Sequence, residues 1–213
     1  MTKRNVFVVG NADSALVRMF KEFDWPIIDN IRYADVVQFT GGEDITPSFY
    51  NQGWHPKTGA PNITRDKKEA YIFQMCKQVR KPMLGICRGG QFLNVMCGGD
   101  MWQDVDNHCS DHMVKDEVYN IEYKATSTHH QQMIPTDKAV LIAHANVSRK
   151  KSRMGPNGAG IDNEWNNEPV DPEVVYYEEE NCLCFQPHPE LAGYKDLANI
   201  YRIYIDDLVF EGH

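Results

Sequence analysis

The sequence lacks several features that would place the protein at a membrane, outside the cell or on nucleic acid. No apolar run approaches the roughly 20 residues that a transmembrane helix needs. The apolar run near the N-terminus is interrupted by Asn11 and Asp13, too early for a secretory signal peptide. The formal net charge of −8 argues against a general binder of nucleic acid or anionic membranes. We therefore expect a cytoplasmic protein with neither a membrane nor a nucleic acid as a partner.

The six cysteines are not spaced as a dense disulfide framework would be. The six cysteines lie in apolar, strand-like or helix-like contexts, at Cys76, Cys87, Cys97, Cys109, Cys182 and Cys184. In a cytoplasmic chain of this size such cysteines are expected to be free thiols. We expect one to be reactive and the others to be small residues of the core, Cys182 and Cys184 included.

Neither an internal repeat nor a low-complexity linker divides the sequence, so we treat residues 1–213 as a single domain. At 213 residues the chain is long enough for a substantial core. Strand-like apolar segments alternate with amphipathic helical segments, which predicts a three-layer α/β sandwich with a mostly parallel central sheet. Ser14 is expected to cap the first helix. Strands are expected at residues 5–10, 26–29, 34–39, 82–86, 119–126, 139–147, 173–178 and 182–186.

Three polar segments are predicted to be irregular. Residues 101–117 carry no clear periodicity. Residues 45–63 and 148–172 are predicted to be long surface loops, and we expect both to cap the functional site, because loops of this length in compact domains are usually functional.

The stretch Gly85-Ile86-Cys87-Arg88-Gly89 has the pattern of a nucleophile elbow, with cysteine in place of serine. A buried strand leads into it and a helix follows. Glycines two residues before and after the nucleophile are needed, because a side chain at either position would collide with the strand or the helix. The amides at the helix N-terminus would stabilise an anion at Cys87.

A cysteine nucleophile needs a base, and the base needs an orienting group. His188 and Glu190 follow the last expected strand. Residues i and i+2 of an extended segment project to the same side, so Glu190 can reach the imidazole of His188. Because the carboxyl ends of parallel strands meet at one edge of a sheet, His188 can meet Cys87 there. The sequence thus predicts a Cys87, His188 and Glu190 triad.

The attacked carbonyl becomes an oxyanion that needs two preorganised donors. The amide of Arg88, directly after the nucleophile, is one candidate. A glycine amide at Gly41 or Gly42, after the strand at 34–39, is the natural second.

The residues proposed for the site also have purely structural interpretations. A cysteine in a strand–helix turn is more often a packed small residue, and a His-Pro-Glu segment is often a surface turn. Gln91 can be an exposed helical residue or face a substrate, and His129 and His130 can belong to a solvated loop. Histidines at 108 and 112 could share a metal, but no third or fourth ligand is indicated. We therefore predict neither a metal site nor a cofactor.

Together these motifs resemble the class I glutamine amidotransferase superfamily, through the stretches 85–91 and 188–190. The closest resemblance is to its γ-glutamyl hydrolase branch, which includes the γ-glutamyl-γ-aminobutyrate hydrolases. Four further stretches resemble that branch, at residues 41–47, 65–69, 94–104 and 127–131. The chain departs from the branch at Gln186, where a hydrophobic or aromatic residue is usual close before the histidine.

The resemblance implies a flavodoxin-like fold and a reaction through a thioester on Cys87. It also implies an oxyanion hole formed by the amides of Gly42 and Arg88. It suggests that Gln91, Ser127, Thr128 and His129 hold the α-amino and α-carboxylate groups of a glutamyl substrate. The expected function is hydrolysis of a γ-glutamyl amide bond, of glutamine or of a γ-glutamyl amine.

Two other functions remain open at this stage. In one, the chain is a glutaminase that delivers ammonia to a synthetase or ligase partner. In the other, the chain is a binding protein on the same fold with an inert cysteine. The sequence indicates neither the leaving amine nor the oligomeric state.

Overall fold

The computed structural model describes residues 2–105, 108–145, 153–154, 164–165 and 168–212. Within these residues, no helix has the length and apolar character needed to cross a membrane. Most of the loop predicted at 148–172, with its expected capping role, lies outside the described residues. The parts of it that are described include three two-residue strands, β11 (Arg153–Met154), β12 (Glu164–Trp165) and β13 (Glu168–Pro169).

A nine-stranded mixed sheet runs through the described part of the chain. Its parallel half contains, in spatial order, β2 (Ile27–Ile28), β1 (Val6–Val9), β3 (Val36–Phe39), β4 (Met83–Ile86) and β15 (Cys182–Phe185). Its antiparallel half continues with β14 (Pro172–Tyr177), β10 (Val140–Ala145), β7 (His112–Asp116) and β8 (Ile121–Ala125). Since β4 and β15 are parallel neighbours, the residues that follow them leave the sheet at the same edge.

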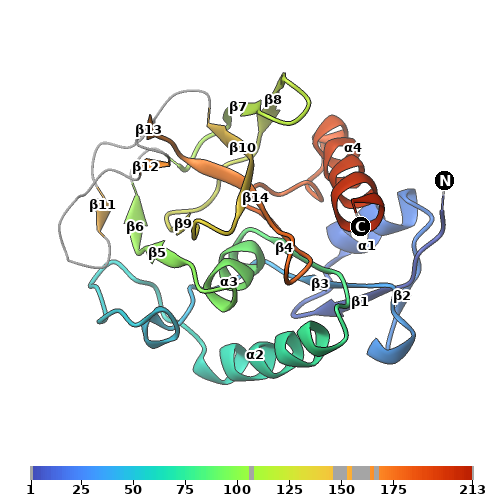
Figure 1. Cartoon of the computed structure of the whole chain (residues 1–213), viewed down its shortest axis with the longest axis horizontal. Coiled ribbons are helices and arrows are strands. Elements are labelled where there is room, and N and C mark those ends of the chain that lie inside the picture. The colour runs from blue at the N-terminus through green and yellow to red at the C-terminus, as the bar shows by residue number, and fades with distance from the viewer. Residues whose placement is uncertain (1, 106–107, 146–152, 155–163, 166–167, 213) are drawn as a thin grey trace.

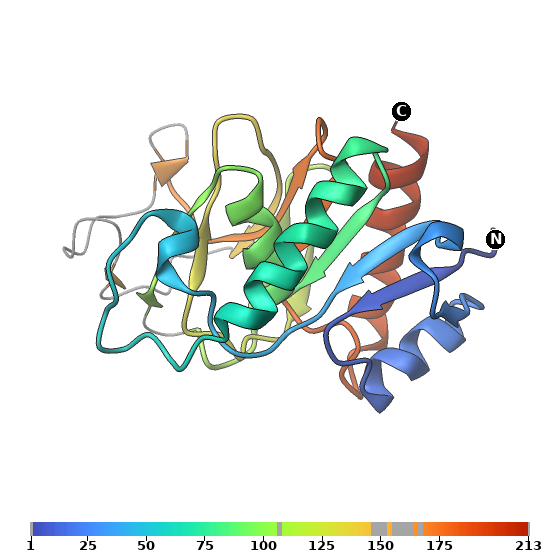
Figure 2. The ribbon, with the colours of Figure 1, turned by 90° about the horizontal axis from the view of Figure 1, so that it is seen from below.

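Helices cover both faces of this sheet, which confirms the predicted α/β sandwich. Helices α1 (Ser14–Glu22) and α4 (Lys195–Tyr204) lie together on one face, and the chain continues from α4 into η3 (Ile205–Glu211). Helices α2 (Ile63–Gln78) and α3 (Arg88–Met96) cover the other face (Figures 1 and 2).

Strand β15 shows why the central strands are apolar throughout. Leu183 and Phe185 pack in the core beneath α1 and α4, while Cys182 and Cys184 pack in the core beneath α2 and α3. This alternation follows from the two-residue period of a strand that is buried on both faces. It confirms that the two cysteines belong to the core.

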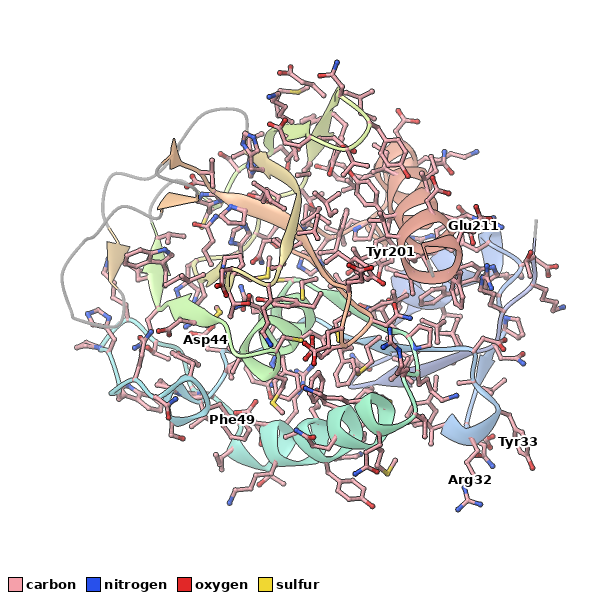
Figure 3. The ribbon with its side chains drawn as sticks, viewed as in Figure 1. Arg32, Tyr33, Asp44, Phe49, Tyr201 and Glu211 are labelled. Atoms are coloured by element: carbon pink, nitrogen blue, oxygen red, sulfur yellow. The ribbon has the colours of Figure 1, made fainter. Side chains whose placement is uncertain are left out.

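One buried polar contact ties α4 to the sheet. Tyr201 lies between α4 and the sheet (Figure 3), and its hydroxyl donates to Gln38 Oε1 on β3 at 2.7 Å. Gln38 in turn donates through Nε2 to the carbonyl of Phe39 at 2.8 Å. The pairing lets both polar side chains be buried without losing their hydrogen bonds.

Two local predictions are wrong. Asp13, rather than Ser14, caps α1, because its carboxylate accepts from the amides of Ala15 and Leu16 at 2.9 Å. Residues 101–117 are not irregular throughout, since they contribute to β5 (Asp100–Trp102), β6 (Asp104–Val105) and β7. Strand β5 pairs with β9 (Gln132–Ile134) and β6 pairs with β11, so these short strands are defined by distant partners.

The predicted loop at 45–63 is largely a loop, with one short helical turn, η2 (Pro47–Tyr50). A second such turn, η1 (Ile31–Tyr33), precedes β3. Polar side chains hold the 45–63 loop against Gln103, the residue that follows β5. Thr58 Oγ1 donates to Gln103 Oε1 at 2.5 Å, and Gln103 Nε2 donates to Gln52 Oε1 at 2.6 Å.

Candidate active site

Cys87 occupies a strained turn between β4 and α3. Its backbone has φ of 51° and ψ of −115°, a left-handed conformation that a side-chain-bearing residue rarely adopts. Its carbonyl accepts from the amide of Gln91 at 3.0 Å, so it is the N-cap of α3. The residue is 9% exposed. The predicted elbow is therefore present in the structure.

The glycines around Cys87 are required sterically. A Cβ atom on Gly85 would lie 2.4 Å from the backbone of Gly89, and one on Gly89 would lie 2.3 Å from the carbonyl oxygen of Phe39. A Cβ on Gly90 would lie 2.9 Å from the amide nitrogen of Phe185. These contacts let α3 begin directly against β3 and β15, and that close approach fixes the position of Cys87.

His188 lies beside Cys87 and is oriented by Glu190. The imidazole Nδ1 lies 2.7 Å from Glu190 Oε1. Burial disfavours the charged imidazole, but the interactions of His188 with Cys87 and Glu190 outweigh burial and raise the pKa of His188 to about 10. The structure thus brings together the three residues that the sequence predicted as a triad.

The loop after β3 closes against the same histidine. A Cβ atom on Gly41 would lie 3.1 Å from His188 Cε1 and 3.8 Å from Cys87 Cβ. Gly42 has φ of 142°, which favours glycine, and a Cβ there would lie 2.3 Å from Arg65 Nη1. Only glycines let this loop approach both the histidine and Arg65.

A buried ionic network joins this loop to the elbow. The guanidinium of Arg88, 1% exposed, forms ion pairs with Asp66 and Glu69 on α2, and its Nε donates to the carbonyl of Glu43 at 3.2 Å. Arg65 also pairs with Glu69, at 2.7 Å.

Arg65 contacts the loop after β3 directly. Arg65 Nη2 donates to the carbonyls of Thr40 and Gly41, both at 3.0 Å. The sequence showed Arg65, Asp66 and Glu69 only as a family-like motif. The structure gives them the role of fixing the Gly41–Gly42 loop against the first turn of α3.

A cleft of about 360 Å³ opens beside His188 and Glu190. Its walls come from the ends of β1 and β3 and from the first turn of α1. It is lined by Asn11, Asp13, Leu16, Thr40, Gly41, Gly42, Glu43, Arg65, Ile86, His188 and Glu190. This placement agrees with the rule that α/β proteins bind ligands at the carboxyl edge of the sheet.

The four residues suggested for substrate binding do not line this cleft. The side chains of Gln91, Ser127 and His129 are buried, whereas Thr128 is exposed. Gln91 Nε2 donates to the carbonyl of Gln131 at 3.0 Å, and Ser127 Oγ donates to the carbonyl of His108 at 2.5 Å. These two side chains hold the 126–131 segment in place, and their suggested contacts with substrate remain predictions.

His108 and His112 lie in a buried cluster that the sequence did not reveal. Their rings are joined there by Glu173 of β14 and by His129. Burial lowers the pKa of His129 to about 4. Burial also opposes the charge on Glu173, but the neighbouring histidines, with His112 hydrogen-bonded to it, outweigh burial and lower its pKa. Among the described residues this is where a metal ion could be held.

The elbow at the carboxyl edge of a parallel sheet, with a histidine and a carboxylate after the neighbouring strand, defines a class I glutamine amidotransferase-like protein. The Peptidase C26 family model matches residues 8–153, which is more than half of the chain. The chain therefore belongs to the Peptidase C26 family.

Curated relatives match over shorter stretches. Protein NtpR of Enterococcus hirae is 38% identical over 74 residues, which are 35% of this chain and 31% of that protein. A glutamine amidotransferase-like protein, the YvdE homolog of Lactococcus lactis subsp. cremoris, is 38% identical over 71 residues, 33% of this chain and 38% of that protein. The chain thus spans about a third of the length of these relatives.

Solved structures share the fold over nearly the whole chain. A chain of PurLQS from Thermotoga maritima superposes with a TM-score of 0.69 at 15% identity, covering 98% of this chain and 100% of that chain. A glutamine amidotransferase from the same organism gives a TM-score of 0.59 at 14% identity, covering 96% and 83%. At these identities the likeness shows the fold of the superfamily alone.

Proposed function

We propose that the protein is a cysteine-nucleophile hydrolase that cleaves a γ-glutamyl amide bond, in glutamine or in a γ-glutamyl amine. The observation that carries this proposal is the position of His188, whose Nδ1 lies 2.7 Å from Glu190 Oε1 and whose imidazole lies next to Cys87 at Gly41. Membership of the Peptidase C26 family supports it.

In the proposed first half-reaction, His188 acts through Nε2, because Nδ1 is directed to Glu190. Nε2 takes the thiol proton before the attack, because the raised pKa of His188 favours the imidazolium, and Cys87 Sγ then forms a bond to the γ-carbonyl carbon. The imidazolium then gives that proton to the leaving amine as the C–N bond breaks, which leaves a thioester. In the second half-reaction His188 deprotonates a water molecule that attacks the thioester, and glutamate leaves as the thiol is restored.

The oxyanion of both tetrahedral intermediates is proposed to bind the amides of Gly42 and Arg88. Arg88 is the first residue of α3, where backbone amides have no partner within the helix. Gly42 lies in the loop that contacts His188 and is fixed by Arg65. Removing one such donor costs about 3 kcal/mol of transition-state stabilisation.

We also propose that Gln91 and Thr128, together with the backbone of Ser127 and His129, recognise the glutamyl α-amino and α-carboxylate groups. Thr128 supplies the exposed side chain of this set. Gln91 would have to exchange its bond to the carbonyl of Gln131 for a bond to substrate.

A glutamine-analogue affinity label tests the proposal. Cys87 should react first and stoichiometrically, and excess glutamine or a γ-glutamyl amine should slow the reaction. The matched control is Cys97→Ser, which removes a half-buried free thiol at the C-terminal end of α3 and should leave the saturable labelling unchanged. If Cys87→Ala labels at the wild-type rate, Cys87 is inert and the chain is a binding protein; if γ-glutamyl compounds give no protection, the proposed substrate class is wrong.

A second candidate is a glutaminase that passes ammonia to a synthetase or ligase partner. It is favoured by the fold shared with a GMP synthase component from Thermoplasma acidophilum, at a TM-score of 0.62 and 18% identity over 94% of this chain and 92% of that chain. Turnover of glutamine and of γ-glutamyl amines by the isolated protein separates the two candidates. A stand-alone hydrolase turns over at least one of them without a partner, whereas a partner-dependent glutaminase releases ammonia from glutamine only when a synthetase is added.

A further inference from the structure

A second cluster of chemistry-bearing side chains lies at the sheet edge, outside the proposed triad. His112 opens β7, Glu173 belongs to β14, and His129 comes from the segment after β8. His108 completes the set. All four side chains are at least nine-tenths buried, with exposed fractions of 0% for His108 and Glu173, 4% for His129 and 5% for His112. A buried charge of this kind needs compensation.

The three imidazoles each direct one ring nitrogen away from the cluster, to an acceptor. His129 Nδ1 lies 2.8 Å from the carbonyl of Gln131, and His112 Nδ1 lies 3.3 Å from the carbonyl of Ser110. His108 Nε2 lies 3.1 Å from Asp171 Oδ2. Since carbonyls and carboxylates only accept, these nitrogens carry the protons.

The opposite nitrogen of each ring faces Glu173, and that of His129 presents a lone pair to it. His112 Nε2 lies 3.0 Å from Glu173 Oε1, and His108 Nδ1 lies 3.6 Å from the same oxygen. His129 Nε2 lies 4.0 Å from Glu173 Oε2. His129 Nε2 and Glu173 Oε2 are thus two buried acceptor atoms that face each other, an arrangement that a bound cation would stabilise.

A hydrogen bond accounts for the contact between His112 and Glu173 but not for the other two contacts. Separations of 3.6 and 4.0 Å exceed those of a hydrogen bond. Within the described residues, the buried atoms His129 Nε2 and Glu173 Oε2 have no hydrogen-bond partner. Two ligands of a tetrahedral zinc ion, each about 2.1 Å from the metal, lie about 3.4 Å apart, close to the spacings found here.

We propose that His108, His112, His129 and Glu173 form a binding site for a divalent transition-metal ion of the zinc type. Three imidazole nitrogens and one carboxylate oxygen are a donor set suited to Zn²⁺. The outward bonds to backbone carbonyls and to Asp171 are the second-shell contacts that orient metal-binding histidines. With four protein ligands the site is closed, so its metal has a structural role.

The ion would join segments that are far apart in sequence. It would tie the start of β7 and the start of β14 to the 126–131 segment. That segment also accepts a hydrogen bond from the proposed active site, since the amide of His188 donates to Thr126 Oγ1 at 2.6 Å. Metal binding would therefore stiffen the support of His188 without contributing to the chemistry.

The test uses the full chain, stripped with a chelator and titrated with Zn²⁺ alone. We expect one Zn²⁺ per chain, a rise in Tm on binding, and with Co²⁺ the visible ligand-field bands of a tetrahedral site. His129→Gln and Glu173→Gln should weaken Zn²⁺ binding by at least about 100-fold, and Asp171→Asn by about 10- to 100-fold. The matched control His144→Gln changes a histidine outside the cluster, bonded to Glu117, and should bind Zn²⁺ as the wild type does.

Two outcomes would overturn the proposal. One is a stripped wild-type chain that neither takes up Zn²⁺ stoichiometrically nor gains thermal stability from it. The other is Zn²⁺ binding that is equally tight in wild type, His129→Gln and Asp171→Asn. The wild-type measurements need no variant to fold, and they do not depend on the protein having hydrolase activity.

Discussion

The backbone N–H of His188 donates a hydrogen bond to the side-chain hydroxyl of Thr126 at 2.6 Å. Thr126 follows β8 and is 1% exposed. The contact joins the antiparallel half of the sheet to the residue proposed as the catalytic base. His188 is thus held on two sides, by Glu190 at its ring and by Thr126 at its backbone.

Thr126→Val tests whether this contact positions His188. The variant keeps the shape of the side chain but leaves a buried donor unsatisfied, which costs about 1–3 kcal/mol. We expect kcat/KM for a γ-glutamyl substrate, or the rate of Cys87 labelling, to fall about 10- to 100-fold. Thr126→Ser keeps the hydroxyl and should stay within about threefold of wild type. Equal losses in both variants would assign Thr126 a packing role only.

Gly42→Ala tests the proposed oxyanion loop. The added Cβ would lie 2.3 Å from Arg65 Nη1, at a φ of 142° that disfavours a side chain. Because one misplaced oxyanion donor costs about 10²–10³ in kcat, we expect a loss of that size with the far-UV circular dichroism unchanged. Gly53→Ala is the matched control, since its Cβ meets no atom within 4 Å. Full activity of Gly42→Ala would show that a glycine is not needed at this position to place the amide.

The central part of the site could be predicted from sequence because its requirements are local. Gly85 and Gly89 flank Cys87 for steric reasons that any strand–helix elbow shares. Glu190 reaches His188 as an extended segment predicts, although Pro189 and Glu190 lie in a turn in which the amide of Leu191 donates to the carbonyl of His188 at 3.4 Å. The meeting of these two segments then follows from parallel strands that end at one sheet edge.

The parts of the fold and of the site that the sequence did not predict depend on pairings between residues far apart in the chain. Residues 101–117 were predicted to be irregular because β5 and β6 are too short to show a period, and they are defined by β9 and β11. Glu173, 61 residues from His112, could not be recognised as a partner of that histidine. Arg88 was considered only for its amide, while its side chain makes the buried ion pairs with Asp66 and Glu69.

Asp66→Asn tests the contribution of that buried network to stability. Asp66 is 0% exposed and pairs with Arg88, so the substitution leaves part of a buried guanidinium charge uncompensated. Breaking a buried ion pair in this way costs about 3–5 kcal/mol in the free energy of unfolding. The measurement is equilibrium unfolding in urea.

The control for this experiment is Glu43→Gln. The Glu43 side chain is 37% exposed and pairs with Arg65 at 2.7 Å, and such exposed pairs contribute about 1 kcal/mol or less. If both variants lower the free energy of unfolding equally, the Arg88 network is no more important for stability than a surface ion pair.

The titration of His188 offers a direct test of its two partners. Burial opposes its charge, but Cys87 and Glu190 together raise its pKa to about 10. We expect NMR of the His188 ring to show titration near that value in the wild type. Cys87→Ala and Glu190→Gln should each lower it toward the ordinary value of about 6.5. A wild-type value at or below that ordinary value would contradict the proposed Cys87–His188–Glu190 arrangement.

The same raised pKa predicts how His188 contributes to stability as pH changes. A group whose pKa is higher in the folded state binds its proton more tightly there, so protonation favours folding. The stabilisation is fully present below about pH 6.5, the pKa in the unfolded chain, and is lost as pH rises through about 10. The measurement is the difference in free energy of unfolding between wild type and His188→Gln, which cancels the titration of the other groups. We expect this difference in the free energy of unfolding to be largest near pH 6.5 and to decrease steadily toward about pH 10. A difference that is constant or grows with pH would mean that His188 is not held as an imidazolium between Cys87 and Glu190.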